Sequence, residues 1–172
     1  MAEIEPFDID DDYSPPAVPA SASALIFDER GRLLILRPTY KSGWTIPGGV
    51  MESDGETPWQ ACCREVREEC GLQVASARLA CVDFRRPRPS NPGGIRFLFD
   101  CGPLDDTELR DVVLQPAEIA EHLMAPLADA LVLLRKPIRR RVQAVRRRDG
   151  RSRHRGTVYL EDGRPVAAVR AA

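Results

Sequence analysis

Three closely spaced glutamates, Glu65, Glu68 and Glu69, are the side chains in this sequence best suited to do chemistry. At about 100° per residue they fall on one arc of an α-helix. Like charges at this spacing repel one another by a few tenths of a kcal/mol (about 0.2–0.5) per pair, and by more against protein. Hard divalent cations such as Mg²⁺ or Mn²⁺ favour oxygen ligands and keep room for water and substrate phosphates. The spacing therefore indicates a divalent-cation site, with a solvated acidic helix face as the alternative.

The helix that must position these glutamates has recognisable ends. Thr57 can be its N-cap, Pro58 suits the first helical position, and Gln60 completes a Thr-x-x-Gln capping box. Gly71 is suited to the position after the last turn. An adjoining arc can face a core and carries Trp59, Cys62, Cys63, Val66 and Cys70.

Together with their flanking residues, these glutamates resemble the Nudix hydrolase signature, G-x5-E-x7-R-E-U-x-E-E-x-G-U, where U is a bulky aliphatic residue. The preceding run from Trp44 to Gly49, WTIPGG, also resembles the family. One departure is visible: six residues, not five, separate Gly49 from Glu56, which we interpret as an insertion near Ser53 and Asp54. The positions that fit are Glu56, Arg64, Glu65, Val66, Glu68, Glu69, Gly71 and Leu72.

The resemblance implies an α/β fold, a Nudix-type α/β/α sandwich with a central mixed β-sheet. It implies that Mg²⁺, or Mn²⁺ in its place, is held by the backbone carbonyl of Gly48 and by carboxylates. The implied metal ligands are Gly48, Glu65, Glu68 and Glu69.

The resemblance also implies roles in catalysis. Glu65, Glu68 and Arg64 are expected to be catalytic, with Arg64 paired to Glu56. Many members carry a further glutamate as metal ligand or base, and Glu118 fits that position best, with Glu121 in reserve. The candidate substrate contacts are Lys41, Trp44 and Arg96.

The remaining helices and strands are predicted from the periodicity of apolar and polar residues and from the positions of turn residues. An Asp-Gly turn at 162–163 predicts a C-terminal β-hairpin, either an added sheet edge or a dimer contact. Helices are expected over 123–134 and, in a basic stretch, over 138–148. The expected strands are 21–27, 32–37, 44–46, 73–84, 95–101, 112–114, 157–160 and 165–169.

Length and composition indicate one globular domain of 172 residues with 43% hydrophobic residues. We divide it into a flexible acidic N-terminal arm (1–20), a Nudix hydrolase domain (21–136), and a basic helical segment with a hairpin packed on the same domain (137–172). No apolar run is long enough to span a bilayer, and the acidic N-terminus leads us to expect no signal peptide. Five cysteines without a CxxC motif indicate reduced thiols and a cytoplasmic protein.

The resemblance to the Nudix family implies Mg²⁺-dependent hydrolysis of a diphosphate linkage in a nucleoside diphosphate derivative. Glu65 or Glu118 would accept the proton of the attacking water. Two alternatives remain: hydrolysis of a non-nucleotide biosynthetic diphosphate, or a Nudix-fold module that binds a nucleotide or nucleic acid. The net charge of −1 gives no general attraction to nucleic acid, although residues 135–155 carry eleven bases and one acid. We therefore expect a small-molecule substrate, no membrane association and no nucleic-acid partner, with a homodimer as one alternative.

Overall fold

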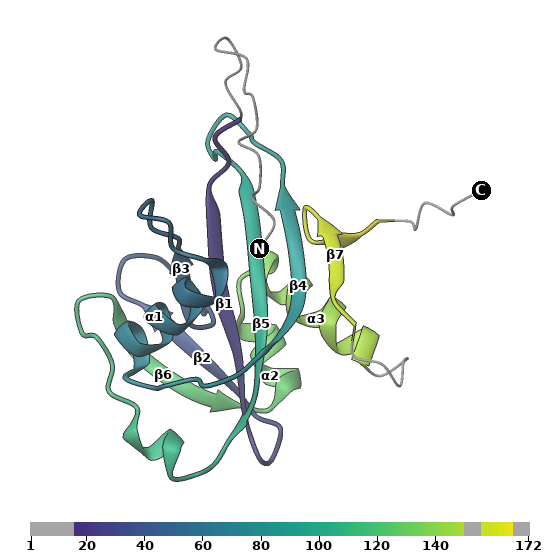
Figure 1. The fold of residues 1–172 in the computed structure, drawn as a ribbon. Coiled ribbons are helices and arrows are strands. Elements are labelled where there is room, and N and C mark those ends of the chain that lie inside the picture. Colours follow the sequence, from purple (N-terminus) through teal and green to yellow (C-terminus); the bar gives the residue numbers. More distant parts are fainter. Residues whose placement is uncertain (1–15, 150–155, 167–172) are drawn as a thin grey trace, which may run out of the picture.

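In a computed structural model, which describes residues 16–149 and 156–166, the chain forms one mixed sheet flanked by helices (Figure 1). Within these residues the sheet has eight strands, in the order β6-β2-β1-β5-β4-β7-β8, with β3 paired to β1. The strands are β1 (Ala20–Asp28), β2 (Leu33–Pro38), β3 (Gly48–Val50), β4 (Arg78–Arg85), β5 (Gly94–Leu104), β6 (Ile119–Ala125), β7 (Val158–Glu161) and β8 (Arg164–Pro165). The helices are α1 (Pro58–Cys70), a 3-10 turn (Glu108–Asp111), α2 (Leu127–Leu133) and α3 (Lys136–Asp149).

The central strand β1 separates two hydrophobic layers. Because successive side chains of a strand point to opposite faces, Ala22, Ala24 and Ile26 pack towards α1, whereas Leu25 and Phe27 pack towards α2 and α3. β1 runs parallel to β5 and antiparallel to β2 and β3, so the sheet is mixed. The predicted α/β/α sandwich is therefore confirmed.

The C-terminal elements continue this sheet. The helix α3 contributes Ile138, Val142 and Val145 to the core, and β7 lies parallel to β4. Asp162 and Gly163, with φ of 51° and 72°, form the turn of the predicted hairpin. Its second strand is short, and residues 167–169 lie outside the described part of the chain. None of the helices described there is long and apolar enough to cross a membrane.

Some predicted element boundaries are wrong. The helix expected over 123–134 is in fact β6, whose residues pair with β2, followed by the short helix α2. No strand forms at 112–114, and 44–46 makes only isolated bridges while the strand lies at 48–50. The strand expected from residue 73 begins at Arg78, and β5 extends to Leu104 in what was expected to be a loop. The five cysteines are unpaired, as expected.

Candidate active site

The helix α1 has the ends that its sequence predicts. The Thr57 hydroxyl accepts the N–H of Gln60 at 3.3 Å, and the Gln60 side chain accepts the N–H of Thr57 at 2.9 Å. Gly71 has φ of 70° and donates its N–H to the Arg67 carbonyl. These caps fix where α1 begins and ends, and its buried face of cysteine and valine fixes its rotation, so the glutamates face β3.

Glu69 is the most buried of the three glutamates, with 4% of its surface exposed. Its Oε2 accepts the backbone N–H of Gly48 at 2.8 Å. Burial raises the pKa of Glu69 to about 7. The Gly48 bond and the charge of Lys41 oppose this rise, whereas the charges of Glu65 and Glu118 add to it. Glu69 is thus a buried acid whose negative charge is only partly balanced by the Gly48 N–H and the charge of Lys41.

Glu65 lies against the backbone of Gly49. A Cβ atom placed on Gly49 would overlap the Glu65 carboxyl group, 2.6 Å from Oε2. Burial raises the pKa of Glu65; bonds from Arg64 oppose the rise, and the charges of Glu68 and Glu118 increase it. The second glycine of the pair therefore provides the space into which this carboxylate fits.

Replacing Gly49 with alanine is expected to displace the Glu65 carboxylate and to lower kcat by about 10–100-fold, as for groups that orient metal ligands. The added methyl group meets only the flexible end of a side chain, and Gly49 lacks the positive φ of Gly48, so the fold should survive. Steady-state kinetics and thermal unfolding measure the two effects. Unchanged kcat would show that the Glu65 position is unimportant.

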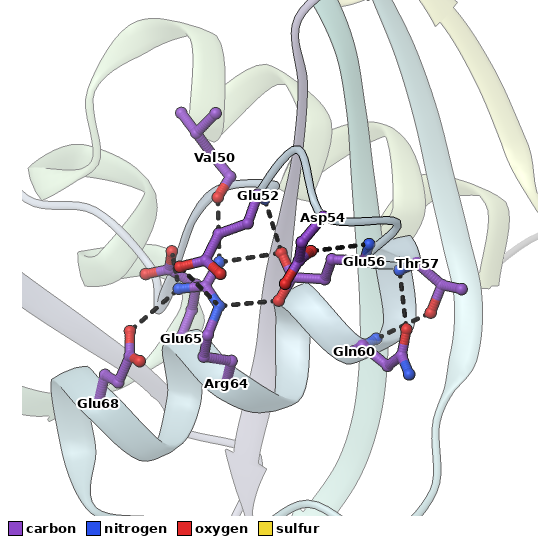
Figure 2. Close-up of polar contacts among 9 residues, drawn as sticks. All are labelled: Val50, Glu52, Asp54, Glu56, Thr57, Gln60, Arg64, Glu65 and Glu68. Carbon is purple, nitrogen blue, oxygen red and sulfur yellow. Dashed lines mark hydrogen bonds and ion pairs between the residues drawn. The ribbon is translucent and has the colours of Figure 1, made fainter.

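The Arg64 guanidinium group contacts several carboxylates of this site (Figure 2). Its Nε lies 2.8 Å from Glu56 Oε1, and its Nη1 lies 2.9 Å from Glu65 Oε1 and 3.0 Å from Glu68 Oε2. Its Nη2 donates to the carbonyl of Val50 at 3.1 Å. The bond from Arg64 lowers the pKa of Glu56, and the carboxylates raise the pKa of Arg64. The expected pairing of Arg64 with Glu56 is confirmed.

The loop containing the extra residue folds back on Glu56. The Glu56 carboxylate accepts the N–H of Glu52 at 2.8 Å, and the N–H of Glu56 donates to Asp54 Oδ1 at 3.1 Å (Figure 2). These bonds close the loop locally, so the additional residue leaves the contact between Glu56 and Arg64 intact.

Two residues from loops outside α1, Glu118 and Lys41, act on the same carboxylates. The charge of Glu118 raises the pKa of both Glu65 and Glu69, and the charge of Lys41 lowers that of Glu69. The reserve candidate, Glu121, instead forms a surface ion pair with Arg37 at 2.7 Å. The structure therefore favours Glu118 over Glu121 as the additional acid.

Trp44 and Arg96 are engaged elsewhere. Trp44 packs against the core between the sheet and α2 and α3, on the side opposite α1. The Arg96 guanidinium donates to the backbone carbonyls of Gly93 at 2.7 Å, Ile95 at 3.2 Å and Pro19 at 3.4 Å. Neither side chain is brought into contact with the glutamates of α1.

The arginines of the loop at 85–94 are held by the C-terminal hairpin. Asp162 lies 3.1 Å from Arg86, 3.5 Å from Arg85 and 3.6 Å from Arg88, and Glu161 also pairs with Arg86. These ion pairs favour a hairpin loop packed on the C-terminal hairpin over a loop that binds phosphate.

The chemistry of the donor set fits a divalent cation. Within residues 16–149 and 156–166, no three acidic, histidine or cysteine side chains converge as a ready-made metal centre, and Arg64 is hydrogen-bonded to Glu65 and Glu68. Burial is the main cause of the raised pKa values of Glu65 and Glu69, the neighbouring carboxylates add to the rise, and the candidate ligands are all oxygens. These features define a carboxylate site on an α/β/α sandwich.

Comparisons with known proteins agree with this site. The family model NUDIX domain matches residues 18–147. A MutT-like protein from Streptomyces ambofaciens is 37% identical over 116 residues, 64% of this chain and 72% of that protein. An 8-oxo-dGTP diphosphatase from Proteus vulgaris is 39% identical over 62 residues, 34% of this chain and 54% of that protein.

A solved crystal structure is also similar to this chain. The MutT protein from Methanosarcina mazei Go1 is 26% identical, with a TM-score of 0.66 over 78% of this chain and 96% of that one. The chain therefore belongs to the Nudix hydrolase family, whose members act on pyrophosphate bonds and generally use a divalent metal.

Proposed function

We propose that this protein hydrolyses a diphosphate linkage in a nucleoside diphosphate derivative, with Mg²⁺ or, in its place, Mn²⁺. The observation that carries the proposal is a pair of carboxylates, the buried Glu69 and the half-buried Glu65, beside Gly48 and Gly49, with the charge of Glu118 added to theirs. A bound divalent cation would relieve this excess of negative charge and would also attract the phosphate oxygens of an anionic substrate.

The residues that would hold the cation are Glu65, Glu68, Glu69 and the carbonyl of Gly48. When bound, the cation supplies charge neutralisation at the phosphate oxygens. Glu65 and Glu68 are now hydrogen-bonded to Arg64, so Arg64 sets their orientation before anything binds.

Glu65 or Glu118 would accept the proton of the water that attacks phosphorus, and the raised pKa of Glu65 suits such a base. Lys41, whose charge lowers the pKa of Glu69, would meet a substrate phosphate. We retain Trp44 and Arg96 as proposed substrate contacts, which would require Arg96 to exchange backbone partners for substrate and the substrate to reach Trp44 on the side of the sheet opposite α1.

Among substrates, a nucleoside triphosphate is the first candidate, because the similar proteins include one named 8-oxo-dGTP diphosphatase. A nucleotide sugar, a dinucleotide polyphosphate or a non-nucleotide biosynthetic diphosphate would present the same linkage. The five unpaired cysteines favour a cytoplasmic location, and the short edge strand β8 is where a second subunit would pair in a homodimer.

The alternative that this chain is a module that binds nucleic acid depends on the basic helix α3. The contacts of the α3 arginines weaken this alternative. Arg141 is buried against Asp83, Arg140 packs on Gly163, and Arg139 donates to the carbonyl of Leu131 at 3.4 Å. The side chain of Arg148, which the sequence groups with them, lies outside the described part. Three arginines of α3 are thus engaged within the fold, which leaves the exposed Arg146 and Arg147 for nucleic-acid phosphates, and we expect no nucleic-acid partner.

The proposal predicts product release when nucleoside triphosphates, nucleotide sugars and dinucleotide polyphosphates are screened with Mg²⁺ and Mn²⁺ and analysed by mass spectrometry. The variant Glu68→Gln removes one carboxylate charge from an exposed position and should lose about 100-fold or more in kcat. Glu121→Gln, on the exposed strand β6, is the matched control and should retain full activity. Normal turnover by Glu68→Gln would contradict the proposal, as would a screen in which no diphosphate is cut.

A further inference from the structure

The segment that carries Glu118 is anchored to α1 at one end. The N–H of Val113 donates to the Cys70 carbonyl at 2.9 Å, and that of Gln115 to the Glu69 carbonyl at 3.4 Å. A turn follows, in which the Gln115 carbonyl accepts the N–H groups of Glu118 at 3.1 Å and Ile119 at 2.9 Å. Residues 113–119 therefore extend from the end of the helix that carries the other glutamates.

The opposite end of this segment is held by Thr39, immediately after β2. The Thr39 N–H donates to the Glu118 carbonyl at 2.8 Å, and the Thr39 hydroxyl donates to the Ala117 carbonyl at 2.8 Å and lies 3.2 Å from that of Glu118. One residue thus contributes both its backbone and its side chain to the two peptide groups beside the Glu118 side chain.

We propose that Thr39 is a positioning residue, which holds Glu118 opposite Glu65 and Glu69 and thereby helps to form the cation site. This inference rests on the proposed function, since it assigns Glu118 to that site. Glu118 belongs to a turn rather than to a helix or strand, so its direction depends on the anchors at each end. The bonds of Val113 and Gln115 to the carbonyls at the end of α1 keep the Glu118 turn beside the helix that carries Glu69.

The test compares Thr39→Val, which keeps the branched shape but removes the hydroxyl, with Thr39→Ser, which keeps the hydroxyl. Mn²⁺ affinity, measured by electron paramagnetic resonance on the full chain, should fall about 10-fold in Thr39→Val and stay near wild type in Thr39→Ser. Thr39 is exposed, so the thermal midpoint should change little. Thr107→Val is the matched control, because Thr107 is also exposed and its hydroxyl accepts a bond from Arg110.

A second comparison shows whether Thr39 acts through Glu118. Glu118→Gln should also weaken Mn²⁺ binding, and adding Thr39→Val to it should cause no further loss. The inference would be overturned if the losses of Mn²⁺ affinity in the two single variants added fully in the double variant, or if either single variant bound Mn²⁺ as tightly as wild type. If Mn²⁺ affinity falls in Glu118→Gln but not in Thr39→Val, Thr39 has no positioning role, whereas the proposed function still stands.

Amide hydrogen exchange provides a readout that needs neither metal nor substrate. Peptides covering residues 113–119 should exchange faster in Thr39→Val than in wild type or Thr39→Ser, because the hydroxyl no longer holds the Ala117 carbonyl. Unchanged exchange would overturn the positioning role. If wild-type protein binds no Mn²⁺ at all, the proposed function fails, whereas the exchange data still decide whether Thr39 holds this segment.

Discussion

Replacing Glu69 with glutamine is expected to abolish hydrolysis and, without metal, to stabilise the fold above neutral pH. Burial raises the pKa of Glu69 from about 4.5 to about 7, so the folded state binds more protons than the unfolded state between these values. Stability of the metal-free protein therefore falls as pH rises through that window. One pKa unit is worth about 1.4 kcal/mol, so the ionised carboxylate costs the fold roughly 3 kcal/mol at pH 8.

Glutamine keeps the shape of Glu69 and an oxygen that can accept the Gly48 N–H, but it carries no charge. Urea unfolding in EDTA should show equal stability of the two proteins near pH 4.5 and a growing advantage for the variant towards pH 8. Activity should fall at least about 100-fold, beyond the loss typical of residues that only support metal ligands.

Mg²⁺ provides the control for this prediction. Added Mg²⁺ should stabilise wild-type protein, since a ligand that binds only the folded state raises the free energy of unfolding, and it should stabilise Glu69→Gln much less. A variant that is less stable than wild type at pH 8 in EDTA, or that still responds fully to Mg²⁺, would show that Glu69 is not an uncompensated carboxylate of the cation site.

The parts of the site that sequence predicts well are those set by neighbouring residues. Thr57, Pro58, Gln60 and Gly71 specify the ends of α1 through caps that span three or four residues. The helical period then places the glutamates on one arc, and the contact of Arg64 with Glu68 follows from their i, i+4 spacing. Such features need no knowledge of the rest of the fold.

The parts that sequence predicts poorly depend on contacts between distant residues. Thr39 carries no role in the sequence-based predictions, because its partners lie 78 and 79 positions away and its own neighbourhood has no distinctive pattern. Val113 was expected in a strand, but its N–H donates to the end of α1 instead. The leucines of β6 and α2 fit a helical period, yet pairing with β2 makes 119–125 a strand.

The largest loss of stability is expected from Asp83→Ala, far from the glutamates. Asp83 is fully buried on β4, accepts the Gly163 N–H at 2.8 Å, and lies 3.2 Å from Arg141 Nε on α3. Removing it leaves Arg141, itself buried, without its countercharge, and such a loss typically costs about 3–5 kcal/mol. For a chain of this length, the thermal midpoint should fall by roughly 6–20 °C.

Three further variants separate the buried charge from other causes. Asp83→Asn keeps an oxygen for the Gly163 N–H but loses the charge, so it should lie between wild type and Asp83→Ala. Adding Arg141→Met to Asp83→Leu removes both buried charges and should recover part of the loss. Glu121→Ala breaks the exposed pair with Arg37, and should cost less than about 1 kcal/mol. If Asp83→Ala cost no more than this surface pair, the buried contact could not be what joins α3 and the C-terminal hairpin to the sheet.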